Sequence, residues 1–240
     1  MKKTIVISGV SKGLGAAICR KILGKGWIVA GFSRSSNQEI KNLQKKYKKN
    51  FFFEKFDVTN FRKIESFIKK AQSRGKIYGL INNAGVVDED LIARQNKKAI
   101  KNLVNINLLG PIYLSSEVIK YLMINGEGRI INISSVVAKS GYKGTAVYSS
   151  TKSALNGFTR ALSRELGSRN ITVNAVSPGF METNLTKNMS KDKLRQIIRR
   201  TPIGRVGKVT DMLGLISFLL SKEASFISGQ IILVDGGLSA

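Results

Sequence analysis

Short, almost continuously apolar segments alternate with segments of helical spacing along the chain, and this alternation constrains the fold more than any other feature. In residues 61–72, for example, apolar side chains recur at intervals of three and four residues, as on the buried face of a helix. Because strands this apolar are buried on both faces, they indicate a parallel sheet covered by helices. Right-handed crossovers then predict a doubly wound α/β fold of the Rossmann type, with ligands at the carboxyl ends of the strands. The predicted strands are Thr4–Ser8, Trp27–Ser33, Phe51–Asp57, Gly79–Asn82, Gly128–Ser134, Ile171–Ser177 and Gln230–Val234.

The sequence predicts a single domain over residues 1–240, because it shows no linker, low-complexity tract or internal repeat. Ile5–Ile7 is too short for the apolar region of a signal peptide and leads straight into a glycine-rich loop, so we interpret it as part of the first strand. No apolar run approaches the ~18 residues that cross a membrane. The single cysteine, Cys19, excludes internal disulfides and a multi-cysteine metal site, and it favours a cytoplasmic location.

Histidine does not occur in the sequence, which excludes Ser-His-Asp chemistry and metal sites built on histidine. Any proton transfer must therefore run through Tyr, Lys, Asp, Glu or water, and we predict no metal. The 40 Lys and Arg residues outnumber the 15 Asp and Glu residues, and a net charge of +25 attracts anions. Because these cations are spread along the chain, a compositional bias explains them better than a dedicated polyanion site. We therefore predict binding to neither nucleic acid nor membrane.

A glycine-rich loop, residues 8–15, lies between the first predicted strand and the first predicted helix. Its glycines follow the spacing G-x-x-x-G-x-G, which allows a tight turn and a close backbone approach to a ligand. The free N–H groups of the helix N-terminus that follows are suited to a pyrophosphate. We therefore predict a dinucleotide site. Its cofactor-binding residues in this loop are Gly9, Ser11, Lys12, Gly13, Leu14 and Gly15.

The end of the second predicted strand indicates which dinucleotide is bound. An acidic residue there would bind a ribose 2′-hydroxyl and favour NAD. The chain instead has Ser33 and Arg34, and the loop contributes Lys12. Two cations without a carboxylate favour a 2′-phosphate, so the sequence predicts NADP(H). The alternative is that Arg34 is one more member of a basic surface.

Tyr148 and Lys152 are four residues apart, so they project from one face of a helix. A free phenol has a pKa near ~10 and transfers protons poorly at neutral pH, but a neighbouring ammonium lowers that pKa. Ser135, which follows an apolar strand, would bring a hydroxyl to the same place. The Tyr–Lys spacing alone is weak evidence, since surface helices often contain it. Together with the serine, it favours acid–base chemistry.

In their order and spacing, these motifs resemble those of the short-chain dehydrogenases/reductases, over nearly the whole chain. The motifs that carry the resemblance are Gly9-x-x-x-Gly13-x-Gly15, Asp57-Val58, Asn82-Asn83-Ala84-Gly85, Asn107, Ser135, Tyr148-x-x-x-Lys152 and Pro178-Gly179-x-x-x-Thr183. Within that family, residues 128–137, 171–183 and 202–207 look most like those of the 3-oxoacyl-[acyl-carrier-protein] reductases. One departure is Ser8 before Gly9, where the family usually has threonine; the hydroxyl is kept.

The resemblance implies a catalytic set of Asn107, Ser135, Tyr148 and Lys152. Tyr148 would protonate a carbonyl oxygen that Ser135 positions and polarises. Lys152 would lower the pKa of the tyrosine and hold the nicotinamide ribose, and Asn107 would anchor a water that relays protons to Lys152. The family is commonly tetrameric, so a homotetramer is expected. Besides the loop, the implied cofactor contacts are Ser33, Arg34, Asp57, Val58, Asn83, Ala84, Gly85, Tyr148, Lys152, Pro178, Gly179, Met181 and Thr183.

We therefore expect an NADPH-dependent reductase whose partner is an acyl carrier protein bearing a 3-oxoacyl thioester. Two alternatives stay open: an oxidoreductase of the same fold for another small carbonyl, such as a sugar or polysaccharide precursor, and a basic binding protein without turnover. The intact catalytic set argues against the second alternative. Substrate choice is expected to reside in a lid at about 180–210, with a basic helix at Lys191–Arg200. A cationic rim that attracts an acidic carrier would comprise Arg160, Arg164, Arg169, Lys191, Lys193, Arg195, Arg199 and Arg200.

Overall fold

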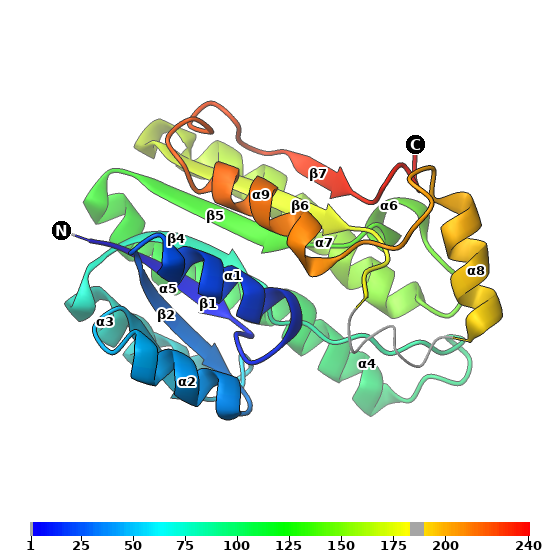
Figure 1. The fold of residues 1–240 in the computed structure, drawn as a ribbon, viewed down its shortest axis with the longest axis horizontal. Helices are drawn as coiled ribbons and strands as arrows, with labels where there is room; N and C mark the ends of the chain where they lie inside the picture. Colours follow the sequence, from blue (N-terminus) through cyan, green and yellow to red (C-terminus); the bar gives the residue numbers. More distant parts are fainter. Residues whose placement is uncertain (1, 183–189) are drawn as a thin grey trace.

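The computed structural model describes residues 2–182 and 190–240. The strands are β1 (Lys3–Ser8), β2 (Ile28–Ser33), β3 (Phe51–Lys55), β4 (Lys76–Asn82), β5 (Gly128–Ile133), β6 (Ile171–Pro178) and β7 (Ile231–Val234). Within the described residues they form one sheet in the order β3-β2-β1-β4-β5-β6-β7, and every neighbouring pair is parallel (Figure 1). This confirms the predicted doubly wound α/β fold.

Helices cover both faces of the sheet (Figure 1). One core lies between the sheet and α1, α2 and α9, and the other lies between the sheet and α3, α5 and α7. The helices are α1 (Gly13–Gly24), α2 (Gln38–Lys46), α3 (Phe61–Arg74), α4 (Lys97–Val104), η1 (Asn105–Leu109), α5 (Gly110–Asn125), α6 (Val137–Ser140), α7 (Ala146–Leu166), η2 (Gly167–Arg169), α8 (Lys191–Arg200) and α9 (Val209–Leu219). None of the helices in the described ranges is long and apolar enough to span a membrane.

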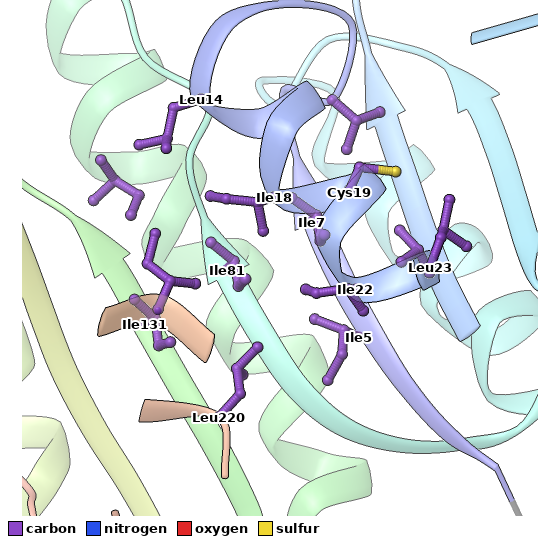
Figure 2. Close-up of a cluster of buried hydrophobic side chains, with 14 of the residues drawn as sticks. Ile5, Ile7, Leu14, Ile18, Cys19, Ile22, Leu23, Ile81, Ile131 and Leu220 are labelled. Atoms are coloured by element: carbon purple, nitrogen blue, oxygen red, sulfur yellow. The ribbon is translucent and has the colours of Figure 1, made fainter. Parts of the chain in front are cut away.

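The first core shows why β1 is apolar throughout. Side chains alternate across a strand, so Ile5 and Ile7 face α1 while Val6 enters the opposite core. Figure 2 shows Ile5 and Ile7 against side chains of α1, among them Cys19. Burial raises the pKa of the Cys19 thiol to about 12, so at neutral pH it stays protonated and acts as a small apolar group.

The second core is aromatic where β2 and β3 pack on α3. Phe67 of α3 is fully buried, with its ring centroid 5.2 Å from that of Phe32 and 5.2 Å from that of Phe52. Phe56, just after β3, stacks on Phe32 at 4.2 Å. These rings pack α3 against β2 and β3 and so stabilise the part of the sheet where those two strands end.

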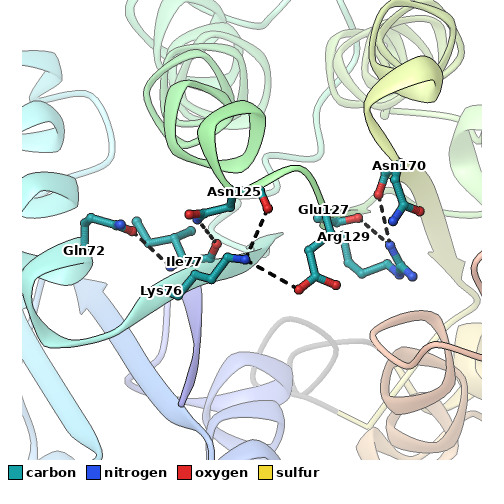
Figure 3. A network of polar contacts seen from close by, with 8 residues as sticks. Gln72, Lys76, Ile77, Asn125, Glu127, Arg129 and Asn170 are labelled. Carbon is teal, nitrogen blue, oxygen red and sulfur yellow. Dashed lines mark hydrogen bonds and ion pairs between the residues drawn. The ribbon is translucent and has the colours of Figure 1, made fainter. Parts of the chain in front are cut away.

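A polar network closes the amino ends of the central strands (Figure 3). Asn125 donates to the carbonyl of Ile77 at 2.8 Å, and Lys76 donates to the carbonyl of Asn125 at 3.1 Å. Arg129, 2% exposed, donates from Nη1 to the carbonyl of Gly128 at 2.8 Å. Because this end is held by the chain's own groups, the carboxyl ends of the strands are the edge left for a ligand.

The predicted elements agree with the structure except at some boundaries. The predicted strand 79–82 begins three residues earlier, at Lys76, which pairs with Lys3 of β1. The N-cap of α9 is Lys208, and the Asp211 carboxylate accepts its N–H at 2.7 Å. The basic helix predicted at Lys191–Arg200 is confirmed as α8.

We predict that Phe67→Ala lowers the free energy of unfolding by about 3–5 kcal/mol, because it leaves a cavity among the rings of the second core. Phe67→Leu keeps an apolar side chain at the same position and should cost less. Urea denaturation of both variants measures the difference. A loss below about 1 kcal/mol for Phe67→Ala would contradict this description of the core.

Candidate active site

A cavity of about 960 Å³ opens at the carboxyl ends of the strands. Its walls come from the loop after β1, the end of β2, the segments that follow β3, β4, β5 and β6, the start of α7 and part of α8. Of the predicted site residues that the structure describes, all line this cavity except Asn107. Thr183 lies outside the described residues. The fold therefore brings together side chains that are far apart in the sequence.

The glycine-rich loop packs directly on the end of β4. The Ser8 hydroxyl accepts the N–H of Asn83 at 3.0 Å and the N–H of Ala84 at 2.9 Å, so the hydroxyl retained at Ser8 joins β1 to β4. Asn83 in turn donates from Nδ2 to the carbonyls of Ser8 at 3.0 Å and Gly9 at 3.2 Å. A Cβ at Gly15 would lie 2.2 Å from the Gly9 carbonyl oxygen, so only glycine fits there. Gly9 also has a φ of +76°, which glycine adopts without strain.

The second strand ends in the predicted basic position. Arg34 extends over the cavity with its Nε 3.8 Å from the Asp57 carboxylate. Asp57 also accepts the N–H of Thr59 at 2.9 Å, which fixes the carboxylate. Asn37, which the sequence did not identify, donates to the carbonyl of Ser11 at 2.6 Å and caps α2. These contacts fix the shape of the end of the cavity nearest β2.

Tyr148 and Lys152 lie on α7, and Ser135 follows β5, at the inner end of the same cavity. Burial raises the pKa of the Tyr148 phenol, while a hydrogen bond with Ser135 opposes that rise. Lys152 is 5% exposed and donates to the carbonyl of Ile133 at 2.8 Å. Burial lowers the pKa of its ammonium to about 8. Because burial dominates, the pKa of Tyr148 is shifted in the direction opposite to that predicted for a tyrosine beside Lys152.

Asn107 lies behind this wall in η1, a five-residue π-helix between α4 and α5. Its side chain is fully buried; Oδ1 accepts the N–H of Val86 at 2.9 Å, and Nδ2 donates to the carbonyl of Val86 at 2.8 Å. Nδ2 also approaches the Thr151 hydroxyl at 3.4 Å. Asn107 therefore ties the segment after β4 to α7, one residue from Lys152. The water relay implied by the resemblance stays a prediction.

The remaining wall comes from the segment after β6, from α8 and from the turn before α7. Phe180 and Tyr142 meet edge to face, with ring centroids 5.3 Å apart. Met181, just beyond, forms a β-bridge with Gly207. Cavity-lining residues that were not predicted individually are Val87, Glu89, Tyr142, Lys143, Phe180, Leu194, Ile198 and Val206. The last four lie in the segment predicted as the substrate lid, whereas the first four are identified by their approach in three dimensions.

Of the eight cations of the predicted rim, Lys193 of α8 is the one that lines the cavity, and Lys191, Arg195, Arg199 and Arg200 lie on the same helix outside the lining. The Nζ of Lys193 lies 2.8 Å from the Glu89 carboxylate. Arg160 is twelve residues beyond Tyr148 on α7, a distance of about 18 Å at the usual helical rise. Arg164 and Arg169 lie further toward the amino end of β6. In this chain these three arginines therefore do not border the cleft, which corrects the prediction.

The residues around the glycine-rich loop fit a dinucleotide, because the backbone at Gly9 and Gly15 leaves the helix N-terminus open to the cavity. The same cavity contains Tyr148, hydrogen-bonded with Ser135, and Lys152, whose Nζ lies 5.9 Å from the centroid of the Tyr148 ring. Fold and site together define a dinucleotide-binding enzyme of the doubly wound α/β class.

Comparison with known proteins identifies the family within this class of enzymes. Residues 9–239 match the family model described as Enoyl-(Acyl carrier protein) reductase. The chain is 37% identical over 238 residues to the 3-oxoacyl-[acyl-carrier-protein] reductase FabG of Rickettsia felis, covering 98% of this chain and 96% of the relative. It is 37% identical to the FabG of Buchnera aphidicola, over 99% of this chain and 97% of the relative. It is 35% identical to the FabG of Escherichia coli K12, over 98% of this chain and 97% of the relative.

The chain belongs to the short-chain dehydrogenase/reductase family. It is therefore an oxidoreductase that acts on carbonyl or alcohol groups with a nicotinamide cofactor. The family resemblance derived from the motifs is confirmed.

We predict that Gly15→Ala weakens binding of the reduced nicotinamide cofactor at least tenfold, about 1.4 kcal/mol, because the added Cβ forces the loop away from Gly9 and Asn83. Gly24→Ala is the matched control, since a Cβ at Gly24 meets no atom within 4 Å. Titration of NADPH fluorescence gives the dissociation constants. Equal constants for Gly15→Ala and wild type would show that the loop does not contact the cofactor.

Proposed function

We propose that the protein reduces a 3-oxoacyl thioester carried on acyl carrier protein to the 3-hydroxyacyl thioester, with NADPH as the reductant. The observation that carries the proposal is the buried Tyr148 phenol, hydrogen-bonded with Ser135 at the inner end of a cleft whose other end is the glycine-rich loop. The substrate class is taken from relatives that share at least 35% of their residues with nearly the whole chain.

In the proposed mechanism, Ser135 binds the carbonyl oxygen and Tyr148 donates a proton to it. A bound nicotinamide supplies the hydride that the carbonyl carbon accepts. Burial favours the protonated phenol, which is the form that a proton donor requires. Lys152 then returns a proton to the phenolate, and a pKa of about 8 allows it to do so near neutral pH. Asn107 binds the backbone of Val86 and approaches the Thr151 hydroxyl, which fixes the segment after β4 beside Lys152.

We infer NADPH rather than NADH from the charges beside the end of β2. The Arg34 guanidinium and the Lys12 ammonium are both available to a 2′-phosphate in the cavity. Asp57 lies near Arg34 and holds its side chain over the cavity. A guanidinium binds a phosphate through charge-assisted hydrogen bonds, which a ribose hydroxyl cannot match.

The wall beyond Tyr148 suits an acyl chain. The rings of Tyr142 and Phe180 and the aliphatic side chains of Leu194 and Ile198 line that part of the cavity. Apolar side chains stabilise a bound alkyl chain roughly in proportion to the area removed from water. Phe180, Leu194 and Ile198 offer a sugar hydroxyl no hydrogen-bond partner, so this part of the wall favours the acyl thioester over a polysaccharide precursor.

We also propose that residues 1–240 act as one domain in which residues 180–210 cover the substrate, and that the enzyme is a cytoplasmic homotetramer. The contact between α8 and the cavity supports the covering role. Phe226, in the segment between α9 and the edge strand β7, is fully exposed, and Phe218 of α9 is 42% exposed. Large apolar side chains in such positions favour contact with another copy.

Consumption of NADPH with three substrates of different classes tests the proposed reaction. These are a 3-oxobutyryl thioester on acyl carrier protein, the corresponding 2-enoyl thioester, and a keto sugar nucleotide. We expect turnover with the 3-oxo thioester well above the other two. Preference for the enoyl thioester would instead favour the reaction in the family description, and preference for the sugar would favour the polysaccharide alternative.

We predict that Tyr148→Phe lowers kcat by about 10²–10⁴-fold, the usual contribution of a general acid, while NADPH binding stays nearly unchanged. The chain has no histidine to replace the phenol as a proton donor. Steady-state kinetics and an NADPH titration measure the two effects. A variant that kept more than a tenth of the wild-type kcat would show that Tyr148 is not the proton donor.

We predict that Arg34→Asp reverses the cofactor preference from NADPH to NADH. The new carboxylate repels a 2′-phosphate and accepts a hydrogen bond from a 2′-hydroxyl. The ratio of kcat/KM for the two cofactors is the measurement. An unchanged ratio would reject the role of Arg34 and leave Lys12 as the phosphate contact.

We predict that kcat/KM for the carrier-bound thioester falls more steeply with ionic strength than kcat/KM for a small carrier-free thioester. The net charge of +25 and the five cations of α8 attract an acidic carrier, and salt screens that attraction. The comparison uses low and moderate concentrations of the same salt. Equal slopes would leave the basic charge as a compositional property.

A further inference from the structure

An ion pair crosses the mouth of the cleft between two segments that are remote in the sequence. Glu89 lies in the segment between β4 and α4, and Lys193 lies in the first turn of α8. The Lys193 Nζ lies 2.8 Å from the Glu89 Oε2, and both residues line the cavity. The pair therefore joins the segment between β4 and α4 to α8, the helix proposed to cover the substrate.

The backbone next to Glu89 is hydrogen-bonded to the turn that precedes α7. The N–H of Asp90 donates to the carbonyl of Gly144 at 3.0 Å, in the turn just before α7. The Asp90 carboxylate accepts the N–H of Leu91 at 2.8 Å and Arg94 Nε at 2.8 Å, so it is engaged within its own segment. Of the three successive carboxylates at residues 88–90, Glu89 is the one that forms an ion pair with α8.

Glu89 also acts on the reacting phenol, because its negative charge is among the causes that raise the pKa of Tyr148. The neighbouring cation of the pair, Lys193, partly offsets that charge, as oppositely charged groups do. The titratable and charged groups that share the cavity around Tyr148 are Lys152 of α7, Tyr142 and Lys143 of the preceding turn, Glu89, Lys193 of α8 and Glu182 after β6. Removing one member of the pair therefore has two effects. It breaks the contact that holds α8 across the cleft, and it changes the electrostatic potential at the Tyr148 phenol.

We propose that Glu89 is a positioning residue for the reduction: it holds α8 across the cleft through Lys193 and places a negative charge beside Tyr148. The inference rests on the proposed function, in which Tyr148 donates a proton. Glu89 touches neither reacting atom in this account. These two effects can be separated experimentally. Glu89 and Lys193 contribute equally to the ion pair that holds α8, but their charges act on the Tyr148 phenol in opposite directions.

The first expectation concerns substrate binding. Glu89→Gln and Lys193→Gln should each raise KM for the 3-oxoacyl thioester about two- to fivefold, the range for a partly exposed ion pair. The double variant should be no worse than either single variant, since the two changes remove one shared interaction. Lys69→Gln removes the same charge from an exposed position on α3, outside α8 and outside the cavity lining, and its KM should equal that of the wild type.

The second expectation concerns pH. Reduction requires protons on Tyr148 and Lys152, so kcat falls on the alkaline side as they are lost. Glu89→Gln removes a charge that favours the protonated phenol, so the phenol step of the alkaline limb, above the Lys152 step near pH 8, should move to lower pH by about half a unit. Glu89→Asp keeps the charge and should retain most of the wild-type pH profile. Lys193→Gln leaves the Glu89 charge without its counter-ion, so its limb should not move to lower pH.

The experiment is a pH series of kcat and KM for wild type, the single variants and the double variant with the 3-oxoacyl thioester and NADPH. An inactive wild type would overturn the proposed function itself. An active wild type with unchanged KM in both single variants would overturn the ion pair across the cleft. Alkaline limbs that move in the same direction for Glu89→Gln and Lys193→Gln would overturn the electrostatic role of Glu89.

Discussion

A parallel sheet buried on both faces is the constraint on which the rest of the structure depends. Its strands carry apolar side chains toward both layers of helices, so polar chemistry is confined to the two edges of the sheet. The amino edge is closed by contacts of Lys76, Asn125 and Arg129 with backbone carbonyls. Because every strand runs in the same direction, the opposite edge gathers the glycine-rich loop, Ser135 and the start of α7 into one cavity.

Burial then determines the protonation of the site more strongly than any charged neighbour. It raises the pKa of Tyr148 despite the opposing hydrogen bond with Ser135, and it lowers the pKa of Lys152 to about 8. Both shifts favour the neutral form, as expected for groups removed from water. The phenol therefore holds its proton until a reaction takes it. A lysine with a pKa near 8 is poised to replace that proton close to neutral pH.

The sequence predicted those parts of the site whose residue types are dictated by local chemistry. Gly9 and Gly15 are needed for a close backbone approach, and Tyr148 and Lys152 are related by one helical turn, so spacing alone identified both features. Glu89 and Asn37 were missed because their roles arise from contacts with α8 and with the glycine-rich loop, which no local spacing records. The rim prediction failed for Arg160 because α7 carries that residue away from the cleft. The direction of the Tyr148 pKa shift was wrong because burial cannot be read from neighbouring residue types.

The central claim is that a buried, protonated Tyr148, supported by Lys152, supplies the proton for carbonyl reduction. The most direct test is kcat of the wild type with saturating NADPH and 3-oxoacyl thioester from about pH 6 to about pH 10. Loss of the Lys152 proton, with a pKa of about 8, and then of the phenol proton removes the donor system, so the account predicts that kcat falls as the pH rises through about 8. A kcat that stays constant or increases up to about pH 10 would contradict it.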